Sequence, residues 1–269
     1  MILRITLLFI ELKERVDREK KSHTENDVLG ESLRLKNRFH HILTYPSYKR
    51  MLSELENAYL NSKSLKVLDY GCGKGLDSLQ LLKSGAKTFG IDISEKYIEL
   101  SKQLAIKNNF NETDFNFQVM DAHDLKFENN SFDLVIGRGM LHHLDANIAL
   151  KSIHKVLKPN GRAIFIEPLA DNPLLKLFRA LTPKARTVDE APFSRTEMKK
   201  LIDPEMWNNK DTMYCGLISA PISVLTSIVL SKYPNNILLK LSDKLETKLN
   251  KHDYFKFLNQ YVLFNLQKI

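Results

Sequence analysis

A glycine-rich segment contains the first residues with the types and spacing needed to bind a ligand. Residues 67–75 read VLDYGCGKG, so an apolar run leads directly into Gly71, Gly73 and Gly75. Glycines let a backbone approach a ligand closely. Their G-x-G-x-G spacing differs from the G-x-G-x-x-G fingerprint that sets a pyrophosphate on a helix N-terminus. Asp69 would repel a pyrophosphate and attract an amino group, so the segment predicts a site for a cationic ligand.

Two further pairs of residues follow apolar runs in the same way. Asp92 and Ile93 end the run after residue 87, and a carboxylate at such a position can accept both ribose hydroxyls of a nucleoside. The alternative for Asp92 is an acid at a helix N-terminus, favoured by the helix dipole. Asp121 and Ala122 follow the next run. These positions extend the predicted site along consecutive strand ends.

A pair of histidines follows the fourth apolar run. Residues 137–144 read GRGMLHHL, which includes His142 and His143. An imidazole has a pKa near neutrality, so either histidine is a candidate base for a proton on an acceptor. The alternative is that the pair packs and caps the local structure. Ligands of open α/β sheets bind at the carboxyl ends of the strands, where this segment would lie.

The elements that must position these residues follow from the alternation of short apolar runs with amphipathic segments, which is typical of a mostly parallel sheet. The predicted strands are Lys66–Tyr70, Thr88–Ile91, Asn116–Met120, Phe132–Ile136, Ala163–Glu167 and a closing antiparallel strand in Gln260–Gln267. The predicted helices are Tyr48–Leu60, Gly75–Lys83, Ser94–Asn108 and Asn147–Leu157, with a turn at 159–161.

Taken in this order, the segments resemble the motifs of class I S-adenosylmethionine (SAM)-dependent methyltransferases, whose first motif has the form hh-D-x-G-x-G-x-G. The resemblance covers residues 65–162 most fully. It implies an α/β, Rossmann-like, seven-stranded sheet, mostly parallel with a closing antiparallel strand. It also implies SAM as the cofactor and helical additions at both ends of the chain.

The resemblance also implies a role for each motif. Asp69, Gly71 and Gly73 would line the pocket for the methionine part of SAM, Asp92 would bind the ribose, and Asp121 and Ala122 would meet the adenine. The remaining residues expected to line the cofactor site are Cys72, Ile93, Arg138 and Gly139.

A segment beyond the motifs resembles a bacterial-type subset of small-molecule methyltransferases. Its pattern is Glu167-Pro168, Asn172-Pro173, Thr182-Pro183, Arg186-Thr187 and Asp189-Glu190. We expect a substrate lid here. Arg179 and Arg186 are candidate ligands for an anionic acceptor, or alternatively partners of the two acids.

The chain divides into three expected parts. Residues 1–64 form an N-terminal helical extension, 65–168 the SAM-binding core, and 169–269 the substrate lid, a helical insertion and the closing antiparallel strands of the same domain. Thr212–Ser231 has no charged residue and precedes a basic segment, Lys232–Lys256. It is either a buried helical insertion or a wall for a lipophilic, membrane-associated acceptor. The apolar start, residues 1–10, is expected to be an amphipathic or strand-like leader without a signal-peptide cleavage site.

Composition limits the function further. The net charge of +8 lies on lysines spaced as on solvated helix faces, which disfavours a nucleic-acid partner. Cys72 and Cys215 are too few for a disulfide framework, which favours a reducing, cytoplasmic setting, with contact to a membrane surface left open.

No metal site is expected from the sequence. Arsenic methylation needs more cysteines, and the chain lacks the Asp and Asp-Asn residues at the positions where catechol-type enzymes bind their metal.

The prediction is a metal-free methyltransferase acting on a small, lipophilic O, N or C acceptor by in-line displacement. A catalytically inactive SAM-binding interaction or membrane-associated regulatory protein is the alternative. A nicotinamide-dependent oxidoreductase conflicts with Asp69 and the glycine spacing. The sequence leaves the acceptor and the oligomeric state open.

Overall fold

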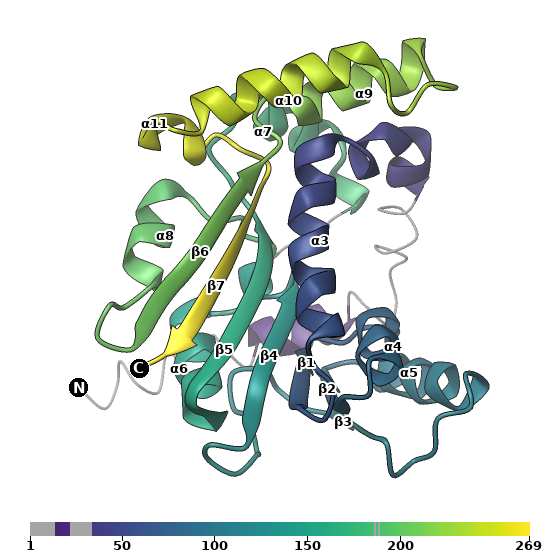
Figure 1. Ribbon diagram of the computed structural model, residues 1–269, viewed down its shortest axis with the longest axis vertical. Coiled ribbons are helices and arrows are strands. Elements are labelled where there is room, and N and C mark those ends of the chain that lie inside the picture. The colour runs from purple at the N-terminus through teal and green to yellow at the C-terminus, as the bar shows by residue number, and fades with distance from the viewer. Residues whose placement is uncertain (1–13, 22–33, 186, 188) are drawn as a thin grey trace.

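The fold is a seven-stranded mixed sheet with helices on both faces (Figure 1). The computed structural model describes residues 14–21 and 34–269, except 186 and 188. The strand order is β3-β2-β1-β4-β5-β7-β6. Strands β1 to β5 pair in parallel, and β7 pairs antiparallel with both β5 and β6. This confirms the predicted class I methyltransferase architecture with a closing antiparallel strand.

The strands are β1 (Lys66–Tyr70), β2 (Lys87–Asp92), β3 (Phe115–Val119), β4 (Phe132–Arg138), β5 (Leu157–Pro168), β6 (Trp207–Cys215) and β7 (Tyr261–Lys268). The α-helices with defined bounds are α3 (Pro46–Leu60), α4 (Leu76–Lys83), α5 (Glu95–Lys107), α6 (Ala146–Val156), α7 (Pro173–Leu181), α8 (Arg195–Leu201), α9 (Ser219–Val229), α10 (Ile237–Leu249) and α11 (Asp253–Lys256). Residues 14–21 and 34–38 are also helical, and three short 3-10 turns are η1 (His40–Leu43), η2 (Leu141–His143) and η3 (Pro183–Ala185).

The two faces of the sheet bury alternating residues of the same strands. Val67 of β1 packs in a cluster with Met51 of α3, whereas Leu68, the next residue, packs in a cluster with Ile153 of α6. Successive side chains of a strand point to opposite faces, so a continuous apolar run is what a strand covered on both sides requires. Figure 1 shows α3 in front of the sheet and α6 behind it.

Side-chain caps fix where the helices begin. The Ser94 hydroxyl accepts from Tyr97 N at the start of α5, and the Asp145 carboxylate accepts from two backbone N–H groups at the start of α6. Such caps satisfy donors that have no partner inside the helix. Both caps lie at the ligand-binding edge of the sheet, where the loops between strands and helices begin.

The C-terminal third differs from the sequence prediction in two ways. The seventh strand of the fold, β6, was not located, and the uncharged run Thr212–Ser231 is not one element: it begins in β6 and continues through Gly216 into α9. Strand β6 has exposed polar residues at 208–211, because it is an edge strand paired only with β7. An exposed edge strand lacks the apolar run that marks a buried one. No helix in the described part of the chain is long and apolar enough to span a bilayer.

Strand β5 also begins earlier than predicted. It starts at Leu157 instead of Ala163, and its pairing with β4 shifts register between Phe132 and Leu134. The predicted turn at 159–161 is therefore absorbed into an irregular start of the strand, with Asn160 at φ +62°. The leader expected at residues 1–10 lies outside the described residues.

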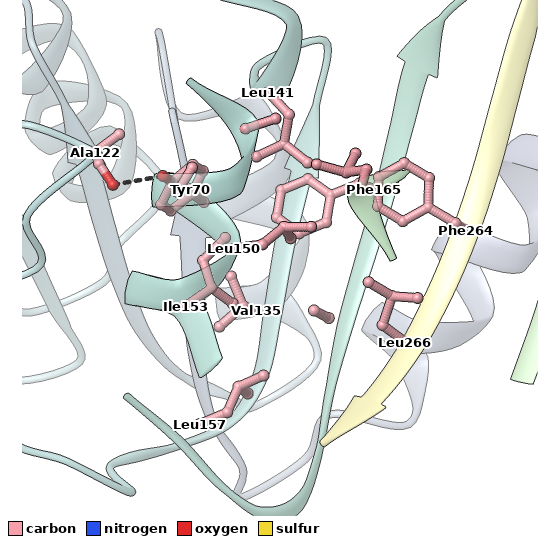
Figure 2. Packing of buried hydrophobic residues seen from close by; sticks show 14 of the residues in the cluster. Tyr70, Ala122, Val135, Leu141, Leu150, Ile153, Leu157, Phe165, Phe264 and Leu266 are labelled. Atoms are coloured by element: carbon pink, nitrogen blue, oxygen red, sulfur yellow. Dashed lines mark hydrogen bonds between the residues drawn. The ribbon is translucent and has the colours of Figure 1, made fainter. Parts of the chain in front are cut away.

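Aromatic side chains connect the sheet to the loop that follows β3. Tyr70, which is fully buried, meets Phe165 edge to face at 5.9 Å, and Phe165 stacks on Phe264 at 5.8 Å. The Tyr70 hydroxyl donates to the carbonyl of Ala122 at 2.5 Å, as Figure 2 shows. The hydroxyl thus holds the Ala122 loop against the core.

Replacing Tyr70 with Phe should remove this bond and leave the buried Ala122 carbonyl without its donor. We expect the free energy of unfolding to fall by about 1–3 kcal/mol, measured by urea denaturation. Tyr254→Phe changes the same group at an exposed position and should be neutral. Equal stability of the two variants would contradict a structural role for the hydroxyl.

Candidate active site

The glycine segment forms a tight loop between β1 and α4. Gly71, Gly73 and Gly75 have φ values of +78°, +52° and +78°, in the left-handed region that residues with side chains rarely adopt. The backbone N–H groups of Gly71 and Cys72 both donate to the carbonyl of Ile91, at 3.0 and 2.8 Å. The loop is therefore bonded to the end of β2 and exposes Gly73 at its tip.

The three glycines are needed for different reasons. A Cβ on Gly71 would lie 2.5 Å from the sulfur of Met140, and one on Gly75 would lie 3.0 Å from Ser101. A Cβ on Gly73 would meet nothing within 4 Å. Gly71 and Gly75 allow close packing, whereas Gly73 leaves open space beside the loop for a ligand.

Asp92 bonds the end of β2 to this loop. Its carboxylate accepts from Gly73 N at 3.0 Å and from Ser94 N at 2.9 Å. The side chain is half-buried, so the carboxylate lies at the open side of the loop. Asp92 thus bonds to the backbone of Ser94, the N-cap residue of α5, and its predicted contact with a ribose stays a prediction. Ile93, the next residue, is also half-buried.

Asp69 is placed differently from Asp92. It is buried, and its carboxylate accepts from the Ser78 hydroxyl at 2.5 Å. Burial and the nearby Asp77 carboxylate raise the pKa of Asp69 to about 7. Asp77 itself pairs with Arg138 at 3.0 Å. Asp69 and Arg138 thus form one charge cluster with the start of α4, and their predicted contacts with SAM stay predictions.

The loop after β3 is held by a histidine that the sequence analysis did not single out. Asp121 accepts from the backbone N–H of His123 at 2.9 Å and contacts its Nδ1 at 2.8 Å. Burial opposes ionisation of Asp121, but the hydrogen bonds from His123 and the nearby charges together outweigh burial and lower the pKa of Asp121. The His123 Nε2 in turn accepts from Asp145 N at 3.0 Å. This loop places Ala122 on Tyr70 and leaves Asp121 as a half-exposed carboxylate.

The first histidine of the predicted pair is fixed by a buried carboxylate. His142 Nδ1 lies 2.7 Å from Oε2 of Glu167, at the end of β5, and neither side chain is more than slightly exposed. Glu167 Oε1 also accepts from the backbone N–H groups of Met140 and Leu141, at 3.0 and 2.9 Å. Since Nδ1 is bonded to Glu167, Nε2 is the ring nitrogen of His142 that can meet a ligand.

The second histidine contacts the N-terminal extension. His143 Nδ1 lies 3.4 Å from Oε1 of Glu19, in the helical segment 14–21, and 3.2 Å from the hydroxyl of Thr187. That hydroxyl donates to Glu19 at 2.7 Å, and both Glu19 and Thr187 are buried. The two imidazole rings are 4.2 Å apart between centroids. The extension therefore contributes a carboxylate to the candidate site.

The structure describes one of the two arginines expected to bind an acceptor. Arg179 donates to the carbonyl of Leu169 at 2.7 Å, and Arg186 lies outside the described residues. The carboxylate of Asp189 is bound by Arg18 through two hydrogen bonds, of 2.8 and 2.9 Å. A residue of the N-terminal segment 14–21 therefore pairs with Asp189, and the predicted roles of Arg179 and Arg186 stay predictions.

Two acids at this site were not predicted as functional residues, for different reasons. The sequence position of Glu167 could have marked it as a site residue, since it precedes Pro168 at the end of a predicted strand. Glu19 had none, because it lies in a charged helical run 124 residues before its partner His143. Gly139, at φ +66°, lies beside His142: a Cβ there would be 3.7 Å from the imidazole.

Comparison with known proteins identifies the family of this chain. A family model described as a methyltransferase domain matches residues 61–250, most of the chain. The chain belongs to the class I SAM-dependent methyltransferases. SAM is the cofactor of this family, and the open glycine loop beside Asp92 fits it.

Relatives with curated functions are more distant. The demethylmenaquinone methyltransferase of Staphylococcus aureus is 31% identical over 150 residues, which cover 54% of this chain and 59% of that protein. The same values hold for the Staphylococcus epidermidis enzyme. The chain therefore matches less than two thirds of the length of these relatives.

Solved structures show the same fold at low identity. Geranyl diphosphate C-methyltransferase from Streptomyces coelicolor, in complex with Mg²⁺, geranyl diphosphate and S-adenosylhomocysteine, superposes with a TM-score of 0.59 at 13% identity, covering 82% of this chain and 81% of that one. Phospholethanolamine N-methyltransferase 2 from Haemonchus contortus has a TM-score of 0.59 at 18% identity, covering 93% and 59%. Acceptors as different as these leave the acceptor of this chain undefined.

The raised pKa of Asp69 predicts a pH dependence of stability. A carboxyl group whose pKa is higher in the folded state stabilises the fold below its unfolded value, near 4, and this contribution is lost as the pH rises through about 7. The free energy of unfolding of the wild type, relative to Asp69→Asn, should therefore fall between pH 4 and 7 and level off above pH 8. Chemical denaturation across this range measures the difference.

The exposed Asp124→Asn serves as the control and should run parallel to the wild type. A difference between wild type and Asp69→Asn that does not vary with pH would contradict the raised pKa.

Proposed function

We propose that this chain transfers a methyl group from SAM to a small, lipophilic acceptor. The observation that carries the proposal is the contact between Gly71 and Met140. It places the glycine loop, which is proposed to hold SAM, directly against the segment that leads to His142. Cofactor and acceptor would then meet at the carboxyl ends of β1 and β4, where open α/β sheets bind ligands.

SAM is proposed to bind along the loops that end β1, β2 and β3. Gly73 leaves room for the methionine part, Asp92 is proposed to accept the ribose hydroxyls, and Asp121 with Ala122 is proposed to border the adenine. The lowered pKa of Asp121 supports an acceptor role toward an exocyclic amine, because it favours the ionised carboxylate.

The acceptor is proposed to contact the histidine pair. Methyl transfer from a sulfonium requires an in-line approach and exclusion of water, because the thioether departs as a neutral group. The helical segment 14–21 contacts this side of the site through Glu19, while Arg15 donates to the carbonyl of Asp189 at 2.9 Å. We propose that it acts as a cover that shields the acceptor from solvent.

A lipophilic acceptor is supported by the surface formed by α9 and α10, called here the apolar end. Leucines 238, 241 and 245 of α10 are between 42% and 54% exposed, and Ile228 and Val229 of α9 are more exposed. Figure 1 shows the two helices together at one end of the molecule. Apolar area of this kind on one surface of a protein marks an interaction site.

The charges around the apolar end favour an anionic bilayer as the partner. Lysines 240, 244 and 248 line α10 beside the exposed leucines. The two acids of the same helix do not lie free among these lysines: Asp243 pairs with Arg50 at 2.8 Å, and Glu246 is buried. An amphipathic helix with this pattern binds at the surface of a membrane.

The cofactor proposal is tested by binding. We expect SAM and S-adenosylhomocysteine to raise the melting temperature, since a ligand at 100 times its Kd adds about 2.7 kcal/mol, whereas NAD and NADP should not. Asp92→Ala should weaken SAM binding at least tenfold, measured by calorimetry. Glu95→Ala removes an exposed acid three residues away and should bind normally.

A shift with NAD would contradict the proposal at the level of the cofactor. SAM binding without turnover of any acceptor in a screen of quinones, phenols and prenyl compounds would support the inactive regulatory alternative instead.

The membrane proposal is tested with vesicles. The chain should cosediment with liposomes containing phosphatidylserine and bind less as salt increases, because the lysines contribute about 1 kcal/mol each near an anionic surface. Leu241→Glu with Leu245→Glu should reduce binding at least tenfold. Leu60→Glu changes an exposed leucine of α3 and is the control. Equal binding of both variants would contradict a role for the apolar end.

A further inference from the structure

The histidine pair has a property that a base would not need. His142, His143 and Glu190 each offer one ligand atom, and these three atoms lie within 4.8 Å of one another. Two imidazoles and one carboxylate form a common ligand set for a divalent transition metal ion that keeps open positions for a substrate.

The orientation of the rings supports the same interpretation. His142 Nδ1 lies 2.7 Å from Glu167, and His143 Nδ1 lies 3.4 Å from Glu19. Both carboxylates are buried. Histidine ligands of metals regularly bond their second ring nitrogen to a carboxylate, which fixes the ring and increases its basicity. Here both histidines do so, which leaves Nε2 of each ring as the ligand atom.

The spacing is close to that of an assembled site. Each bond to a zinc-like ion is about 2.1 Å long, so two ligand atoms on one ion lie at most about 4.2 Å apart. The three ligand atoms lie within 4.8 Å of one another, so small rotations of these side chains would bring all three within bonding distance of one ion.

We propose that His142, His143 and Glu190 bind one divalent transition metal ion, with Glu167 and Glu19 as the carboxylates that orient the two imidazoles. The ligand class is a Zn²⁺-like ion, and the acceptor that fits it is a hydroxyl compound. This inference rests on the proposed function for its acceptor but not for the metal. It replaces the sequence-based expectation of a metal-free site and assigns the histidines as ligands instead of bases.

The ion would activate the acceptor by Lewis-acid polarisation. The O–H bond of the acceptor breaks as its oxygen binds the ion, and the proton passes to solvent at that stage, before the site is shielded from water. The oxygen lone pair then forms a bond to the methyl carbon of SAM as the C–S bond breaks, and that electron pair stays on sulfur. The products are the methyl ether and neutral S-adenosylhomocysteine.

Cobalt titration tests the site without any acceptor. The untagged chain, freed of metal by a chelator, should bind one equivalent of Co²⁺ with visible absorption bands, measured by spectroscopy and calorimetry. Glu190→Gln and His143→Gln should weaken binding at least a hundredfold. Glu19→Gln should weaken it about 10–100-fold through loss of the orienting carboxylate. His252→Gln changes an exposed histidine and should have no effect.

Far-UV circular dichroism of each variant shows that it is folded. Less than one equivalent of bound Co²⁺, or unchanged affinity in both Glu190→Gln and His143→Gln, would overturn the metal site. Methyl transfer by a chain that binds no Co²⁺ would overturn the metal site and leave the proposed function standing. Co²⁺ binding that depends on Glu190 and His143, in a chain that does not bind SAM, would support the metal site and contradict the proposed function.

Discussion

The carboxylate of Glu167 is the group on which the geometry of the candidate site depends. It is fully buried at the end of β5, where an ion without partners would be costly. It accepts two short backbone hydrogen bonds from the loop after β4 and contacts the ring of His142. The same charge that would destabilise an apolar interior therefore fixes the loop and the imidazole together, and neither can move without leaving the carboxylate unsatisfied.

The position of Met140 follows from this constraint. Its backbone N–H donates to Glu167, and its side chain fills the space that a Cβ on Gly71 would need. The loop of β1 and the loop of β4 are thus fitted to each other, because their strands are neighbours in the sheet. Packing therefore connects the glycine loop directly to the loop that carries His142.

The C-terminal helices are anchored by a second buried acid. Glu246 accepts from the Ser47 hydroxyl of α3 at 2.8 Å and from backbone N–H groups at the start of α9, including those of Gly216 and Ser219. An anion at a helix N-terminus is favoured by the helix dipole. This bond network holds α9 and α10 against α3 while their outer leucines and lysines stay exposed. The apolar end is therefore a fixed surface of the fold.

The sequence by itself determined the order of β1 to β5, the closing strand β7 and the glycine loop. Each of these has a local sequence pattern: a buried apolar run for β1 to β5, alternating residues for β7, and glycines at positive φ for the loop. It also placed Asp92 and Asp121 correctly at strand ends. Only the tertiary structure decided that Asp69 is buried with Ser78, that β6 completes the sheet, and that Glu19 and Glu190 join the histidine pair. These depend on contacts between residues far apart in the chain, such as Glu19 with Thr187, and on the pairing of an edge strand whose polar residues carry no apolar signal. Local propensity cannot encode such contacts, since they exist only when the chain has folded.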